Sequence, residues 1–344
     1  MRAVRLRSAG DALQVEEVTK PDPTGTEVLI RVGGAGVCHT DLHIVDGTQS
    51  RVELPVTLGH EVAGWIEAAG PGAEPALRPL RLALDDAVVV SGGWGCGECR
   101  ECRAGAEQRC PTSRAPGFQL DGGYAEAMLV PHPRHLVAIG TLDPARAAPL
   151  ADAGLTPFRA VRRAEPWLKG GSRVLLIGCG ALGQFALQLL RILPPDGADL
   201  LVGVRELHPR RLERATQLGA DIALLDGDAE MAREALAGAA DVVLDFVGAD
   251  ATLELAADVV APDGLVLLVG EGGGTIPFGF ASPPVEAWLT TTAWGTANEL
   301  REVVRLARRG SLHWDVETMP LEEAGAAHAR LRSGDVEGRL VLVP

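Results

Sequence analysis

The sequence predicts an α/β protein in which a β-rich part is joined to a doubly wound domain built around a parallel sheet. Up to about residue 150, apolar β-type runs are broken by glycines, and no long amphipathic helix separates them. From about residue 155, strand and helix patterns alternate, which is typical of βαβ units. A chain of 344 residues is long enough for two domains of this kind.

The expected elements follow one another in a clear order. In the first part we expect strands over residues 27–38, 56–70 and 84–93. The second part opens with a helix over 155–168, and its strands are expected at 173–178, 199–206, 221–226, 241–248 and 264–273. Helices are expected between them at 181–193, 208–219, 229–238 and 252–260. One further helix near 298–310 precedes a final strand over 338–344.

Composition argues against several classes of partner. Acidic residues outnumber lysine and arginine by 46 to 32, which gives a formal net charge of −14 and disfavours nucleic acid and anionic membranes. No segment reaches the ~18 uncharged apolar residues of a membrane span, and the amino-terminal run lacks the apolar core of a signal peptide. We therefore expect a soluble, cytoplasmic protein in a compartment where thiols stay reduced.

A glycine motif, GCGALG at residues 178–183, directly follows an apolar strand and opens a helix. In this context the first glycine permits a tight turn, the second lets a pyrophosphate approach the backbone, and the third lets the helix pack on the strand. The helix amino terminus then offers free N–H groups to phosphates, although a bare glycine-rich turn remains the alternative. The predicted contacts to a dinucleotide come from Gly178, Gly180, Ala181, Leu182 and Gly183.

The end of the next strand should bind the adenosine ribose. Glu206 lies 23 residues after Gly183, close to the spacing of about 20 that is typical of the acid that accepts from the ribose hydroxyls. Arg205 precedes it, and Arg211 follows in the next helix as a further cofactor contact. A shift of one residue would place Arg205 at the ribose, where it would favour a 2′-phosphate. The sequence therefore favours NAD(H) and leaves NADP(H) open.

Four of the six cysteines lie in one short stretch, at positions 96, 99, 102 and 110. Disulfides are the alternative, but cysteines three residues apart in a reducing compartment pair poorly. Four thiolates complete a tetrahedral zinc sphere and leave no position for a substrate. We therefore interpret Cys96, Cys99, Cys102 and Cys110 as a structural zinc site, which holds the shape of a loop that buries little apolar surface.

Cys38 and the pair His60–Glu61 stand at turns after apolar strands. A lone cysteine is usually a small buried hydrophobe, and a lone histidine is usually a hydrogen-bonded structural residue. Thiolate and neutral imidazole are nevertheless the ligands that zinc prefers, and three protein ligands with an open fourth position define a catalytic zinc. Their presence in one chain with a dinucleotide motif favours a metal-assisted reaction.

These motifs, in this order, resemble those of the zinc-dependent alcohol dehydrogenases of the medium-chain dehydrogenase/reductase family. The resemblance rests on GVCHTDLH, GHEVAG, the cysteine cluster and GCGALG, and it covers essentially the whole chain. The runs LADAGLTPFRAV and TAWGTANELREVV look more like the bacterial branch that acts on secondary alcohols and ketones with NAD(H). The resemblance implies a GroES-like catalytic domain over 1–153, completed by 294–344, around a Rossmann domain at 154–293.

The resemblance also implies a set of metal ligands. Cys38 and His60 match the first two catalytic zinc ligands of the family, and Asp152 falls at the third, which is often cysteine. Glu61 matches a glutamate that either ligates the zinc or stands just behind it. With the four-cysteine site, the expected stoichiometry is two zinc ions per chain.

Further residues resemble the proton relay and the pocket of the family. Thr40 and His43 are three residues apart, so they share a face of the short helix expected here. Thr40 would accept the substrate proton and His43 would pass it toward solvent; a capping threonine and a surface histidine are the plain alternative. Thr156 matches a hydroxyl residue near the nicotinamide, and Trp94 is a candidate for the substrate pocket. Relatives with this pattern are usually tetramers or dimers, so the resemblance implies a homotetramer or homodimer.

The sequence thus favours a zinc-dependent alcohol dehydrogenase or ketone reductase, and two alternatives remain. The first is a reductase of the same family that acts on an activated double bond or a quinone and needs no zinc. The second is a non-catalytic zinc-binding interaction protein with a degenerate dinucleotide domain. The candidate ligand set argues against the first, and the net charge of −14 together with the intact glycine motif argues against the second.

Overall fold

The computed structural model describes residues 1–194 and 197–344, which form two compact units. The first unit comprises Met1–Leu155 and Trp294–Pro344, and the second comprises Thr156–Ala293. A β-rich unit and a parallel-sheet α/β unit are the architecture that the sequence predicts. The fold class is therefore confirmed.

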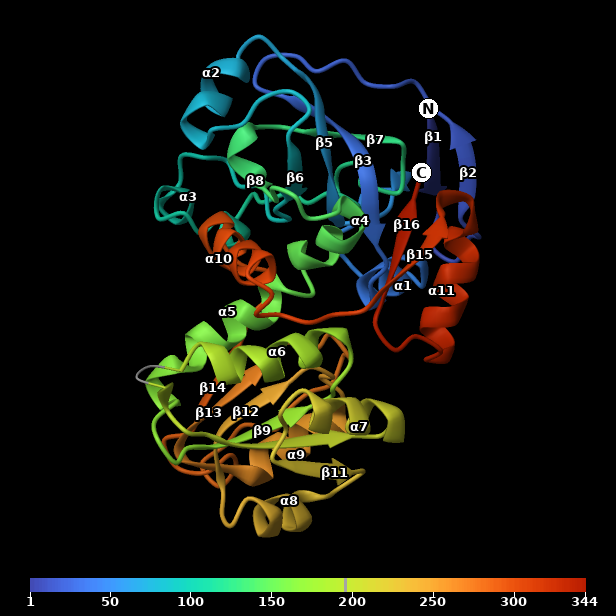
Figure 1. Cartoon of the computed structure of the whole chain (residues 1–344). Coiled ribbons are helices and arrows are strands. Elements are labelled where there is room, and N and C mark those ends of the chain that lie inside the picture. Colours follow the sequence, from blue (N-terminus) through green and yellow to red (C-terminus); the bar gives the residue numbers. More distant parts are fainter. Residues whose placement is uncertain (195–196) are drawn as a thin grey trace. The chain divides into compact units, whose positions relative to one another are not determined.

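The first unit is built on a seven-stranded sheet in the order β15-β16-β3-β5-β6-β8, with β7 also paired to β3. At its centre β3 and β5 are antiparallel, and β16 from the carboxyl end of the chain lies on the other side of β3, where Val341 pairs with Gly36 (Figure 1). The strands are β3 (Val28–Gly36), β5 (Glu61–Ala69), β6 (Ala87–Val90), β7 (Ala127–Val130), β8 (Leu136–Ala138), β15 (Val316–Pro320) and β16 (Arg339–Val343). Segments from both ends of the chain thus build one sheet.

Smaller elements complete this unit. A three-stranded sheet joins β2 (Gln14–Glu17), β1 (Arg2–Leu6) and β4 (Val56–Thr57). The α-helices are α1 (His39–Val45), α2 (Glu74–Leu77), α3 (Arg100–Arg103), α4 (Pro144–Ala147), α10 (Ala297–Arg308) and α11 (Ala324–Ser333), and short 3₁₀ turns include η1 (Arg78–Leu80) and η4 (Ala148–Ala151). Valines, leucines and isoleucines of the strands form the core, together with Tyr124 and Trp94.

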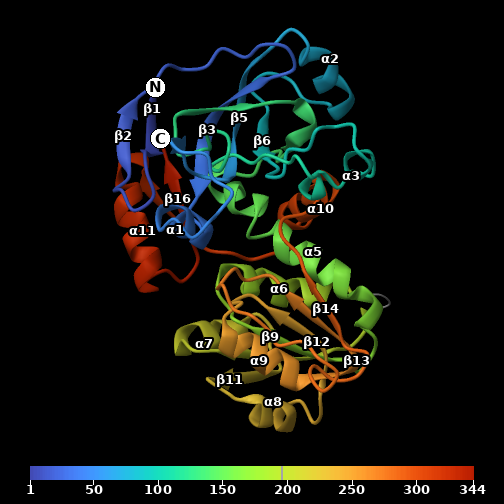
Figure 2. The same ribbon diagram turned by 180° about the vertical axis from the view of Figure 1, so that it is seen from behind.

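The second unit contains a six-stranded sheet whose neighbouring strands are all parallel, in the order β11-β10-β9-β12-β13-β14. Numbered within the unit this order is 3-2-1-4-5-6, the Rossmann arrangement. Helices lie on both faces of the sheet (Figures 1 and 2). The strands are β9 (Arg173–Ile177), β10 (Leu201–Glu206), β11 (Ile222–Leu225), β12 (Ala240–Asp245), β13 (Val260–Leu268) and β14 (Trp288–Thr291).

The helices of this unit are short. They are α5 (Leu155–Ala164, which begins at the last residue of the first unit), α6 (Ala181–Ile192), α7 (Pro209–Gln217), α8 (Ala229–Ala235) and α9 (Asp250–Val259). Within the described residues of the whole chain, no helix has the length and apolar character needed to cross a membrane.

The turn between β9 and α6 shows why glycine is needed at two of its positions. Gly178 has a φ of +84°, a left-handed conformation that side chains rarely adopt. A Cβ at Gly183 would collide with the carbonyl oxygen of Gly178, so α6 can approach the strand only without a side chain there. A Cβ at Gly180, by contrast, would meet nothing within 4 Å. Gly180 is therefore not required by packing within the chain.

This difference gives a direct test of the turn. Gly183→Ala should lower the free energy of unfolding by about 1–3 kcal/mol, as overpacking does, because the methyl group forces α6 away from β9. Gly180→Ala is the matched control, since φ is −68° there and the space is open; it should change stability by less than about 0.5 kcal/mol. Urea unfolding of both variants measures the difference, and equal effects would contradict the packing argument.

Candidate active site

Four metal-ligating side chains from separate parts of the first unit meet at one point. Cys38 lies between β3 and α1, His60 and Glu61 lie at the start of β5, and Asp152 follows η4. One ligand atom from each lies within 4.8 Å of all the others, and all four residues are buried. The structure thus brings together residues that are up to 114 positions apart.

The spacing of these atoms fits a zinc ion. The Asp152 Oδ2 lies 3.9 Å from the Cys38 Sγ and 4.0 Å from the His60 Nε2. Ligands at about 2.0–2.3 Å from a tetrahedral zinc are separated by roughly 3.5 Å, so a small inward movement closes the sphere. A thiolate, an imidazole and a carboxylate also form a donor set that zinc prefers. The residues present therefore fit the metal that the sequence implies.

Asp41 holds two of the candidate ligands, Cys38 and His60, in position. One of its carboxylate oxygens, Oδ2, accepts the backbone N–H of Cys38 at 2.9 Å, and the other, Oδ1, faces the His60 Nδ1 at 3.4 Å. Burial alone would raise the pKa of the Asp41 carboxyl, but His60 and the Cys38 N–H together lower it below its ordinary value. The carboxylate therefore stays ionised and turns the His60 Nε2 toward the ligand cluster.

Tyr124 and His328 extend this arrangement to the carboxyl-terminal helix. The Tyr124 hydroxyl donates to the Asp41 Oδ2 at 3.1 Å and lies 3.3 Å from the His328 Nε2 on α11. Tyr124 is fully buried, and burial raises the pKa of its phenol well above the ordinary value, so the hydroxyl keeps its proton. Asp41 is thus held in place by a donor that does not ionise.

Glu61 forms a buried ion pair with Arg339 of β16. Its Oε1 also accepts the backbone N–H of Ala153 at 3.2 Å, next to Asp152. Burial would lower the pKa of the Arg339 guanidinium, but the Glu61 charge raises it above its ordinary value, so Arg339 stays charged. Among the described residues the Glu61 Oε2 has no hydrogen-bond partner, so one oxygen remains that a metal could use.

The predicted relay residues lie on the helix that starts at Cys38. The Thr40 hydroxyl oxygen is 3.7 Å from the Cys38 Sγ, within one residue of the start of α1. His43 follows one turn later and is half-buried. The structure therefore places Thr40 beside a candidate metal ligand and the half-buried His43 one turn further along the same helix.

Two aromatic residues that the sequence did not single out lie beside His60. The ring centroids of Phe118 and Trp294 are 5.8 and 6.3 Å from that of His60, and they are 5.9 Å from each other. Trp294 belongs to the run TAWGTANELREVV, which resembles the family. Its place in that run was the sequence signal that could have identified it as a site residue. Trp94 is buried instead with its ring N–H donated to the Ser91 carbonyl at 2.7 Å.

The four cysteines of residues 96–110 form a second cluster. Their sulfur atoms lie within 4.8 Å of one another; the Cys102 Sγ is 3.5 Å from that of Cys99 and 3.9 Å from that of Cys96. Sulfur atoms around a tetrahedral zinc are roughly 3.7 Å apart, whereas a disulfide needs about 2 Å. All four cysteines are free thiols. The cluster therefore fits a Cys₄ zinc site.

The surroundings act differently on these thiols: burial raises the pKa of Cys102 to about 12, whereas hydrogen bonds favour the thiolates of Cys96 and Cys110. The backbone N–H groups of Cys99 and Cys102 point to the sulfurs of Cys96 and Cys99. The hydroxyl of Thr112 and the N–H of Cys96 lower the pKa of Cys110 to about 6, so its thiolate forms near neutral pH. A thiolate is the form that binds zinc.

In the second unit, Glu206 lies at the end of β10 and turns toward the glycine motif. Its Oε2 accepts the N–H of Cys179 at 2.8 Å, and its Oε1 accepts the N–H groups of Leu207 and His208 at 2.7 and 3.1 Å. Arg205 is directed elsewhere and pairs with Asp226 at 2.7 Å. Arg211 lies half-buried near the start of α7, and Thr156 is buried in the first turn of α5.

Comparisons with known proteins agree with this arrangement. Residues 24–141 match the family model of the alcohol dehydrogenase GroES-like domain, and residues 218–342 match that of the zinc-binding dehydrogenases. The chain is 35% identical to a D-arabinose 1-dehydrogenase (NADP⁺) of Saccharolobus solfataricus, over 100% of this chain and 97% of that protein. It is also 35% identical to an NAD-dependent alcohol dehydrogenase of Sulfurisphaera tokodaii, over the whole of both.

The structure resembles a solved one over its full length. The alcohol dehydrogenase from the archaeon Aeropyrum pernix superposes with a TM-score of 0.91, at 33% sequence identity and full coverage of both chains. The sequence matches and this likeness cover both units. The chain therefore belongs to the zinc-dependent alcohol dehydrogenase family of the medium-chain dehydrogenases/reductases.

Proposed function

We propose that this protein catalyses reversible hydride transfer between NAD(H) and a secondary alcohol or its ketone. The observation that carries the proposal is the buried meeting point of Cys38, His60 and Asp152 in a chain that also has a Rossmann unit. A reductase of this family that needs no zinc has no use for such a ligand set. The intact glycine motif likewise argues against a non-catalytic zinc protein.

The proposed mechanism assigns each side chain a task. Cys38, His60 and Asp152 would hold the zinc, and Glu61 lies beside them with one oxygen engaged by Arg339. When bound, zinc supplies Lewis acidity toward the substrate oxygen, and the nicotinamide ring supplies the hydride acceptor or donor. The Thr40 hydroxyl, close to the Cys38 sulfur, takes the alcohol proton and donates its own toward His43.

The surroundings of His60 favour an apolar substrate. Phe118 and Trp294 present aromatic rings there and exclude water from that side of the site. Bulky secondary alcohols, including aryl ones, have an apolar surface that matches these rings. Trp94 remains a candidate for the lining of the substrate pocket. The relatives named above are archaeal, so membership of the bacterial secondary-alcohol branch is part of this proposal.

NAD(H) is the proposed cofactor. Glu206 turns its carboxylate toward the glycine motif, where it would accept from the ribose hydroxyls and repel a 2′-phosphate, while Arg205 is paired with Asp226. Gly178, Gly180 and the first turn of α6 would bind the pyrophosphate, with Arg211 and Thr156 as further contacts. One relative named above uses NADP⁺ and another NAD, so the two cofactors need to be compared directly.

We also propose a cytoplasmic homo-oligomer with two zinc ions per chain. Free thiols in both clusters suit a reducing compartment. The edge strand β14 and the segment before it expose large apolar side chains, which suits a subunit contact in a homodimer or homotetramer; these are Phe278, Phe280, Val285 and Trp288.

Asp152→Ala tests the proposed ligand set. Loss of the carboxylate should remove or weaken one zinc and lower kcat by at least about 100-fold, because Cys38 and His60 alone cannot hold the ion and Glu61 is engaged by Arg339. Asp22→Ala, which removes an exposed carboxylate of the same unit, is the control. Metal analysis and NADH absorbance measure both effects, and full activity with two zinc ions would remove Asp152 from the set.

Tyr124→Phe tests the support behind His60. The variant removes only the hydroxyl that donates to Asp41, so zinc release to a chelator should become about tenfold faster while kcat/KM falls. Ser172→Ala removes a buried hydroxyl in the other unit and serves as the control for a general loss of stability. If both variants lose stability alike and neither releases zinc faster, Tyr124 does not position the ligands.

Cys110→Ser tests the division between the two metal sites. The variant should lose one of two zinc ions and unfold at a lower temperature, because its loop depends on the metal for its shape. The remaining folded protein should keep hydride transfer. Cys179→Ala, outside both clusters, should keep both ions. Abolished turnover with folding and metal content intact would show that the four-cysteine site takes part in the chemistry.

A further inference from the structure

A cavity of about 840 Å³ lies within the first unit, between α10 and the edge of the seven-stranded sheet. Four arginines line it: Arg301, Arg305, Arg308 and Arg309. None of its lining residues belongs to the two ligand clusters or to the glycine motif. Its volume is in the range of pockets that hold small organic molecules.

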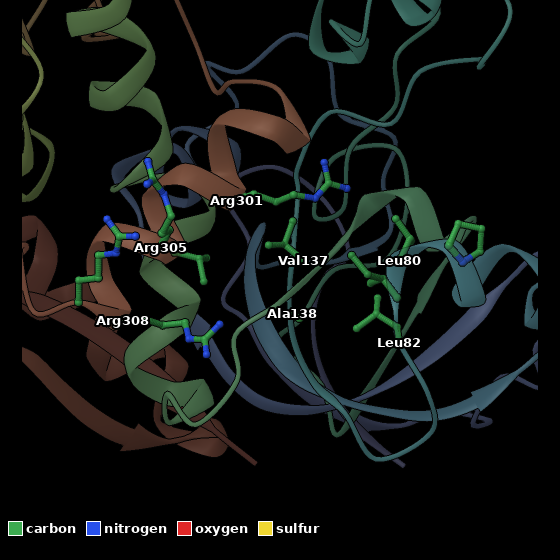
Figure 3. Close-up of a pocket in the computed structure, with 11 residues that line it drawn as sticks. Leu80, Leu82, Val137, Ala138, Arg301, Arg305 and Arg308 are labelled. Atoms are coloured by element: carbon green, nitrogen blue, oxygen red, sulfur yellow. The ribbon is translucent and has the colours of Figure 1, made fainter.

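The arginines share one side of α10. Arg301, Arg305 and Arg308 are four and three residues apart, so successive turns of the helix present them to the same side. Figure 3 shows Arg301 and Arg308 extending from α10 toward the strand that carries Val137 and Ala138. A Cβ at Gly140 would lie 2.9 Å from the Arg308 Cζ, so this guanidinium packs against the backbone that follows β8.

The opposite side of the cavity is apolar. Leu80 and Leu82 come from η1 and the turn after it, and Val137 comes from β8, which is an edge strand because it pairs only with β6 in this sheet. Figure 3 shows the two leucines across the cavity from the arginines. A bound molecule would thus meet guanidinium groups on one side and aliphatic side chains on the other.

The charge of the arginines is only partly compensated. Arg305 pairs with Glu302, and Arg301 donates to the Asn298 side chain. Within residues 1–194 and 197–344, Arg308 and Arg309 form no ion pair, and no acidic residue lines the cavity. In a chain with a net charge of −14 this is a local excess of positive charge, which attracts anions.

Stabilisation of the helix dipole explains only part of this pattern. Cations in the last turn of a helix interact favourably with its carboxyl end, which accounts for Arg308 and Arg309. Arg301 lies in the amino-terminal half of α10, where a cation gains nothing from the dipole. The helix dipole therefore does not explain why Arg301 lines the same cavity as the apolar side chains.

We propose that this cavity binds an organic anion that has a carboxylate or phosphate head and an apolar body. The head is bound by Arg301 and Arg308, whose planar guanidinium groups match the geometry of either anion, and the body packs against Leu80, Leu82 and Val137. This site is separate from the proposed alcohol oxidation, and it does not depend on it.

Calorimetric titration of the zinc-loaded full chain at low ionic strength tests the site, with octanoate as the probe. Octanoate should bind at least about tenfold more tightly than acetate, because its chain covers the apolar wall. It should also bind more tightly than neutral octanol, and added salt should weaken it. Equal binding of octanoate and acetate, or of octanoate and octanol, would overturn the two-sided site. Inorganic phosphate that binds as tightly as octanoate would also overturn the two-sided site.

Variants locate the binding. Arg301→Gln and Arg308→Gln should each weaken octanoate about tenfold and leave alcohol oxidation unchanged, whereas Arg163→Gln, an exposed arginine of α5, should leave both unchanged. Octanoate could instead bind at the catalytic metal site. Binding that survives Arg301→Gln and Arg308→Gln but is lost in Asp152→Ala would assign it there and overturn the proposal.

Discussion

The burial of charge behind the ligand cluster is the constraint on which the rest of the first unit depends. Asp41, Glu61 and Arg339 are almost completely removed from water, and each is stable there only because a partner meets it. Removing one partner of a buried pair of this kind costs about 3–5 kcal/mol. The last strand must therefore pack close to β5, because Arg339 is on β16 and its partner Glu61 is on β5.

The two candidate metal sites differ in whether buried charged groups hold their ligands in place. The Cys38 cluster is built from residues far apart in sequence and is held by charged groups behind it, which suits a site that must keep its geometry with one position open. The Cys96 cluster comes from 15 consecutive positions, uses four thiols and leaves one cysteine exposed. Four identical ligands on a surface loop close a metal sphere and hold the loop. This difference supports the proposal that the Cys96 cluster holds a structural metal and the Cys38 cluster a catalytic one.

The sequence predicted the parts of the molecule that depend on local patterns. Alternating strands and helices predicted the parallel-sheet unit, and the order of motifs predicted the family. The roles of Thr40, His43 and Asp152 stay predictions that depend on experiment. The sequence analysis missed residues whose importance comes from contacts across the fold. In the sequence, Asp41 is an ordinary acidic residue at the start of a helix, and Arg339 looks like a surface cation in a terminal strand. Only the pairing of β16 with β3 gives Arg339 its partner.

The proposed chemistry depends on a zinc ion at the point where Cys38, His60 and Asp152 meet. Anomalous diffraction at the zinc absorption edge, from crystals grown with NAD, tests it most directly. We expect two peaks per chain, one about 2.0–2.3 Å from these three side chains and one among the four cysteines. A peak among the four cysteines alone, with none beside Cys38, would contradict it.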